Sequence, residues 1–147
     1  MTLRAYRDGA LAEEAPFDAA LVAHARDVAS RVWVDAVDPS TDELLALQDA
    51  FGLHELSVED SRSWGQRAKV ERFRDLDFLV VHGLDLDAAG ELEDREVHLY
   101  VGRSFVVTIR RTPLFDFAGT HQLSHGSLSH ADSMALWSVG IRGQRSG

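Results

Sequence analysis

Four short segments in the second half of the chain constrain the fold more than any other feature. They are "KVERF" (69–73), "FLVVHGLDL" (78–86), "EVHLYVG" (96–102) and "FVVTIRR" (105–111). These segments are rich in β-branched and aromatic residues, and short turn sequences such as "DAAGE" and "GRS" separate the later ones. Connections this short join antiparallel neighbours, so the segments predict a four-stranded meander.

The first half of the chain mixes strand and helix signals. The Asp8-Gly9 pair inside "LRAYRDGALAEE" predicts a hairpin of two short strands. A helix is expected within residues 15–30, with Pro16 at an early helical position. The β-branched segment "RVWVDAV" (31–37) predicts a strand that ends before the Asp38-Pro39 pair.

Two further helices are expected before the meander. Ser40 stands three residues before Glu43, which is the spacing of a capping box, and Gly52 supplies the stop signal of that helix. A shorter helix is expected over residues 55–63. The predicted fold class is therefore α/β (α+β): a mixed β-sheet with helices on both faces, an αβα sandwich.

Composition narrows the classes of function. A length of 147 residues predicts one domain, and a net charge of −9 argues against nucleic acid as a partner and favours cations. The chain has no cysteine, which excludes thiolate metal sites and disulfides. It contains neither a nucleophile elbow nor a glycine-rich phosphate loop, so we expect no enzyme. No apolar run reaches the roughly 20 residues needed to cross a bilayer, so we expect a soluble chain with no direct membrane insertion.

Two clusters of potential metal ligands have simpler explanations. Residues 85–96 match several positions of an EF-hand loop, but they lack a ligand at Ala89 and are flanked by predicted strands, which favours a solvated hairpin turn. His121 and His125 are four residues apart and His130 follows, but Gly126 and two serines interrupt any helix there. Surface histidines are the preferred interpretation over a zinc site, including that of a metal-dependent hydrolase.

Glu59 and Asp60 form an adjacent acidic pair within "FGLHELSVEDSRSWGQRAKVERF" (51–73). A solvated helix face is the simplest interpretation of such a pair. Neighbouring side chains on a helix point about 100° apart, so the two carboxylates are poorly placed to chelate one ion together. Each is able to face a different partner or a hydrated ion.

The ordered blocks "FGLHELSVED", "QRAKVE", "FLVV" and "FVVTIRR" resemble the N-terminal cytoplasmic domain of the CorA family of magnesium and cobalt transporters. Family members typically read FGLHPLAVED and HQRPKVE, so this chain departs from the pattern at Glu55, Gly65 and Ala68. The resemblance covers about residues 2–139. It implies the fold of the CorA soluble domain and a pentamer built from copies of the chain.

The resemblance further implies a regulatory role for divalent metal ions. Glu59 and Asp60 match the acidic pair that senses Mg²⁺ at subunit interfaces, where the metal is bound weakly and Co²⁺ is a second candidate ion. Occupied sites would bridge neighbouring subunits and favour a closed channel. The full-length parent would lie in the cell membrane with this domain on the cytoplasmic side.

The resemblance also sets the expected boundaries. Residues 1–139 are expected to form the CorA-like regulatory domain and residues 140–147 a disordered tail, with the family's stalk and transmembrane helices absent. A chain without these helices lacks the pore. The alternative is a free-standing soluble interaction module that has the CorA-domain fold and no transport role.

Overall fold

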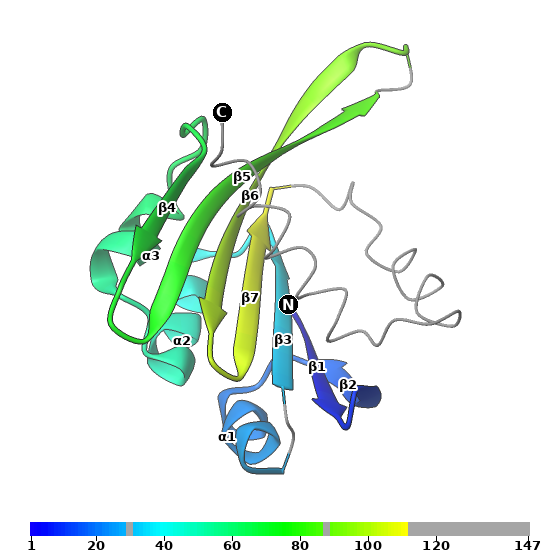
Figure 1. Cartoon of the computed structure of the whole chain (residues 1–147), viewed down its shortest axis with the longest axis vertical. Coiled ribbons are helices and arrows are strands. Elements are labelled where there is room, and N and C mark those ends of the chain that lie inside the picture. Colours follow the sequence, from blue (N-terminus) through cyan, green and yellow to red (C-terminus); the bar gives the residue numbers. More distant parts are fainter. Residues whose placement is uncertain (29–30, 87–88, 112–147) are drawn as a thin grey trace.

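The computed structural model describes residues 1–28, 31–86 and 89–111. Within them a single seven-stranded sheet has the strand order β2-β1-β3-β7-β6-β5-β4. In the same described ranges three helices accompany the sheet (Figure 1). The elements are β1 (Thr2–Arg7), β2 (Ala10–Pro16), α1 (Ala19–Val28), β3 (Arg31–Val37), α2 (Thr41–Phe51), α3 (Glu55–Asp60), β4 (Lys69–Arg72), β5 (Leu76–Leu86), β6 (Leu92–Gly102) and β7 (Phe105–Arg110).

The sheet is mixed, as the sequence predicted. Strands β4 to β7 form the expected antiparallel meander, and β1 pairs antiparallel with both β2 and β3. The parallel pair β3–β7 joins the two halves of the chain, with Val32 opposite Phe105. A buried ion pair fixes this register: Arg110 on β7 donates to both carboxylate oxygens of Asp35 on β3, at 3.0 and 2.6 Å. Two parallel charge-assisted bonds of this kind hold a defined geometry.

Local turn and cap signals account for the best-predicted elements. Asp8 and Gly9 both have positive φ, 52° and 81°, as a two-residue hairpin turn requires. In α2, the side chain of Ser40 accepts from the Glu43 N–H and the Glu43 carboxylate accepts from the Ser40 N–H, so the capping box is confirmed. Gly52 ends this helix in the left-handed conformation at φ 65°.

The expected position of Pro16 in a helix is wrong. Pro16 is the last residue of β2 and pairs opposite Thr2, at the edge of the sheet where a missing N–H is tolerated. The first helix begins three residues later, because the carboxylate of Asp18 accepts the N–H groups of Ala20 and Leu21 at 2.8 and 3.0 Å and caps it there. The short helix α3 likewise ends at Asp60, three residues before its predicted end.

The main core lies between the three described helices and one face of the sheet, so the described residues do not show the predicted helices on both faces. Apolar side chains of α1, α2 and α3 join every second residue of the central strands in one continuous cluster. Val34, Val107 and Leu47 in this cluster are completely buried. A smaller apolar cluster lies on the opposite face, around Leu99. The predicted tail 140–147 and the three histidines His121, His125 and His130 lie outside the described residues.

The β5–β6 hairpin projects beyond the rest of the sheet (Figure 1). On one side β4 pairs with β5 only as far as Val80, and on the other β7 pairs with β6 only from Val97 onward. The described residues of the segment 85–96, considered above as a calcium loop, belong to this hairpin, as the strand signals predicted. Its root is the cross-strand pair of His82 and Glu96.

Candidate functional site

The candidate site is built on α3, the helix that carries Glu59 and Asp60. The side chain of His54 caps its start by accepting the Leu56 N–H at 3.3 Å. A helix of six residues is marginal in water on its own, so α3 depends on tertiary contacts. Ser57 and Val58 are buried against the sheet, whereas Leu56 on the outer face is 62% exposed.

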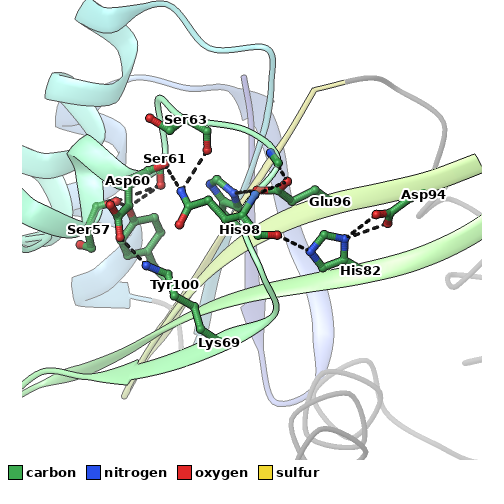
Figure 2. A network of polar contacts seen from close by, with 12 residues as sticks. Ser57, Asp60, Ser61, Ser63, Lys69, His82, Asp94, Glu96, His98 and Tyr100 are labelled. Atoms are coloured by element: carbon green, nitrogen blue, oxygen red, sulfur yellow. Dashed lines mark hydrogen bonds and ion pairs between the residues drawn. The ribbon is translucent and has the colours of Figure 1, made fainter.

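Tyr100 on β6 holds the inner side of α3. Its hydroxyl donates to the Ser57 carbonyl at 2.6 Å and lies 2.7 Å from the Ser61 hydroxyl (Figure 2). The ring is completely buried and packs against Phe78. Burial raises the pKa of Tyr100 to about 12, so its hydroxyl remains protonated and able to donate. This contact fixes the end of α3 against the sheet, next to the acidic pair.

Asp60 faces β4, where Lys69 meets it. The Lys69 ammonium lies 2.5 Å from Asp60 Oδ2 (Figure 2). It also lies 2.8 Å from Glu71 Oε1. Burial alone would lower the pKa of Lys69, but its hydrogen bonds to the two carboxylates raise it. The ammonium therefore stays charged and partly compensates the negative charge of Asp60. The Asp60 side chain is still 37% exposed.

Glu59 lies in a different environment. It is exposed on α3, and within the described ranges no Lys, Arg or His side chain makes an ion pair with it. The structure therefore does not bring the two predicted site residues onto one point: Asp60 turns toward Lys69, and Glu59 faces outward. The two side chains thus point apart, as expected for neighbours on a helix.

The residues around the acidic pair do not form a closed metal cage. In the part of the chain that the structure describes, no three side chains of His, Cys, Asp or Glu gather closely enough to hold an ion. The donors that are present are carboxylate oxygens, which suit a hard, hydrated cation such as Mg²⁺. One chain thus supplies two separated donors, and any further ligands would come from water or another molecule.

Sequence reasoning missed Lys69 and Glu71 as neighbours of Asp60. Both lie inside the block "QRAKVE", and their alternate positions on a strand place them on one side of it. That alternation was the available signal. The path of residues 61–68, which brings this strand back beside α3, could not be read from the sequence.

Comparison with known proteins gives the family. The model of the family described as "CorA-like Mg2+ transporter protein" matches residues 29–124 of the 147. The chain belongs to this family. The resemblance found in the blocks between residues 51 and 111 is thereby confirmed, and α3 with its acidic pair lies inside the matched range.

The chain is similar to the magnesium transporter ALR1 of Saccharomyces cerevisiae. It is 37% identical to this chain over 84 residues, which are 56% of this chain and 10% of ALR1. The manganese resistance protein MNR2 of the same yeast is 35% identical over 63 residues, 43% of this chain and 6% of that protein. The chain thus spans only about a tenth of the length of such relatives.

The fold is that of the CorA soluble domain. The soluble domain of CorA from Methanocaldococcus jannaschii superimposes with a TM-score of 0.61 at 13% identity, covering 88% of this chain and 47% of that one. The complete CorA magnesium transporter from the same organism gives a TM-score of 0.60 at 14% identity, covering 84% and 36%. No helix in the described part of our CorA-family chain combines the length and apolar character needed to cross a bilayer.

Proposed function

We propose that the chain is the Mg²⁺-sensing regulatory domain of a CorA-like divalent-metal transporter. It acts on the cytoplasmic side of the membrane that holds the parent protein, and it works by binding an ion between copies of itself rather than by catalysis. The observation that carries the proposal is the family match across α3, because this helix presents Glu59 and Asp60 at its accessible end.

The chemistry of the pair supports a weak sensor. Mg²⁺ gives up its hydration water reluctantly and is commonly bound through one or two carboxylates together with several waters. Glu59 is exposed, and Asp60 keeps a partly exposed carboxylate beside Lys69. Each is able to contact a hydrated ion whose remaining ligands belong to a neighbouring copy, so binding strength arises only in the assembly.

Regulation then follows from charge. With the ion bound, opposing carboxylates of two copies are bridged and the closed arrangement is favoured. With the ion absent, the same carboxylates repel one another and the assembly loosens. Weak binding is an advantage for this role, because the sensor must release its ion when the cell is short of magnesium. Co²⁺ is the second candidate ion.

The test compares the chain with its full-length parent. Calorimetry on the isolated chain is expected to give only feeble Mg²⁺ binding, and tight binding by a monomer would contradict an interfacial site. In the parent, Asp60→Asn and Glu59→Gln are expected to weaken the protection from proteolysis that Mg²⁺ confers. The matched control is Asp49→Asn, an exposed carboxylate on α2. Protection that is unchanged in both site variants would remove the pair from the sensor.

The free-standing module remains the rival function. The reading frame beyond residue 147 distinguishes the two. A long helical stalk pattern followed by two apolar segments of about 20 residues supports the transporter. Their absence from the gene supports the module.

A further inference from the structure

The segment between α3 and β4, residues 61–68, is held by a carboxylate that the proposed sensor does not use. Glu96 on β6 accepts the N–H of Gly65 at 2.6 Å and the N–H of Gln66 at 3.1 Å through the same oxygen. Its other oxygen lies 2.6 Å from Nε2 of His98. The Glu96 side chain is only 9% exposed, and a buried carboxylate is tolerated when it is hydrogen-bonded in this way.

His98 shows how specific this arrangement is. Its side chain is completely buried, and burial lowers the pKa of its imidazole despite the nearby Glu96, so the ring is neutral at pH 7. A neutral ring that faces a carboxylate through Nε2 carries its proton on that nitrogen. Nδ1 is then an acceptor, and it has no hydrogen-bond partner among the described residues. Trp64 of the connecting segment stacks on this ring, with 4.8 Å between the ring centroids.

Gln66 connects Glu96 to α3, the helix that carries the acidic pair. Its N–H is bound by Glu96, and its carbonyl lies 2.9 Å from Nε2 of His82 on β5. Its side-chain amide donates to the carbonyl of Asp60 at 2.5 Å and to that of Ser63 at 2.9 Å. Gln66 therefore ties the end of α3 to the root of the β5–β6 hairpin.

We propose that Glu96 is the positioning residue of the Asp60 site: it fixes the segment 61–68 through Gly65 and Gln66, and so sets where Asp60 meets Lys69. Glu96 does not touch the ion; it acts through Gln66. The positioning role rests on the hydrogen bonds of Glu96 to Gly65 and Gln66, and of Gln66 to Asp60. The consequence for Mg²⁺ rests on the proposed function.

The position of Glu96 gives the contact a second consequence. Glu96 is paired with His82 at the point where the hairpin leaves the sheet, one residue beyond the last β6 residue that pairs with β7. A displacement of the hairpin root would therefore move Gln66 and, with it, the end of α3. The acidic pair is thus linked to a projecting arm that is distant from it in sequence.

The test uses the whole 147-residue chain and NMR of its amide, imidazole and lysine ammonium nitrogens. In Glu96→Ala we expect the amide signals of Gly65 and Gln66 to lose the downfield shift that a carboxylate acceptor causes. We also expect the signal of the Lys69 ammonium, bound to Asp60, to weaken through exchange with water. Unchanged signals at Lys69 in this variant would overturn the proposal. Glu91→Ala, an exposed glutamate on the same hairpin, is the control and is expected to leave these signals unchanged.

The conservative variant Glu96→Gln separates positioning from folding. Its amide oxygen is able to accept the two loop N–H groups, while its NH₂ group donates to His98 Nε2. The proton of His98 must then move to Nδ1, and the ¹⁵N shifts of the ring report this change of tautomer. We expect the switched tautomer together with a retained Lys69 signal. Loss of the Lys69 signal despite intact loop amides would refute the link.

A second variant keeps the experiment decisive if Glu96→Ala does not fold. Gln66→Ala leaves the Glu96–His98 pair intact but removes the bonds to Asp60 and Ser63, and it is expected to weaken the Lys69 signal alone. In the parent, Glu96→Gln should keep the Mg²⁺ response of the wild type, and Gln66→Ala should shift it. If the signals change as described while Asp60→Asn responds to Mg²⁺ like the wild type, the positioning role survives and the sensor function fails.

Discussion

Replacing Tyr100 with phenylalanine tests directly how α3 is held. The change keeps a fully buried ring and its packing against Phe78, but removes the hydroxyl that lies between Ser57 and Ser61. Each such hydrogen bond contributes about 0.5–1.5 kcal/mol net. The Ser57 carbonyl still accepts the N–H of Ser61 at 3.0 Å and its hydroxyl at 3.1 Å, so neither partner is left without a bond. The two contacts together contribute about 1–3 kcal/mol, so the expected loss of unfolding free energy lies near the low end of that sum, about 1–1.5 kcal/mol.

Urea unfolding followed by circular dichroism measures this loss as a lower midpoint with an unchanged m-value. The partner variant is Ser61→Ala, and the double mutant completes a cycle that isolates the contact between the two hydroxyls. Their coupling energy is expected to be about 0.5–1 kcal/mol. A single-mutant loss below about 0.3 kcal/mol, or a coupling of zero, would refute the reasoning that Tyr100 anchors α3. A changed m-value would mean that the variant no longer unfolds from the same native state.

Three further predictions concern other parts of the fold. Lys69→Met should lower the free energy of unfolding by up to about 1 kcal/mol at low salt, because the carboxylates of Asp60 and Glu71 then face each other without a cation. In urea unfolding, added NaCl should recover part of this loss. Equal losses at both salt concentrations would contradict the prediction. The hydrogen bond to Asp94 raises the pKa of His82, and the charge of Glu96 adds to this. Protonated His82 therefore stabilises the fold fully below its ordinary pKa of 6.5. This contribution is lost as the pH rises through the higher pKa of the folded state. The stability gap between wild type and His82→Gln should accordingly be wider at pH 5.5 than at pH 8.5, with the reverse order counting against the assignment. Leu47→Ala should cost about 2–5 kcal/mol in the same assay, since the side chain is completely buried, and a cost under 1 kcal/mol would show that the core refills the space.

The features predicted well from sequence are those decided within a few residues. The Asp8-Gly9 turn and the capping box of Ser40 and Glu43 depend only on local backbone chemistry, and both are confirmed. Pro16 was misplaced because proline suits two local settings, the first turn of a helix and the end of an edge strand. Only its pairing with Thr2 across the hairpin decides between them.

The surroundings of the acidic pair depend on longer connections. The sequence identified Glu59 and Asp60 as candidates, but the partner of Asp60 is nine residues away, at Lys69. Glu96 reaches Gly65 across 31 positions. No periodicity encodes contacts of this kind, because they arise from the path of a connecting segment over the sheet. The pairing of β3 with β7 escaped prediction for a similar reason: strand patterns indicate which residues face the core but not which strands become neighbours.

The parallel pairing of β3 with β7 has a consequence for folding during synthesis on the ribosome. Each β3 residue from Val32 to Val37 pairs with the residue 73 positions later, as Val32 does with Phe105. At a translation rate of about 5–20 residues per second, a ribosome needs about 4–15 s to make the missing partner. During that interval β1, β2 and β3 have an open apolar edge, which is a target for holding chaperones. Strands β1, β2 and β3 therefore cannot join the rest of the sheet until β7 has been synthesised.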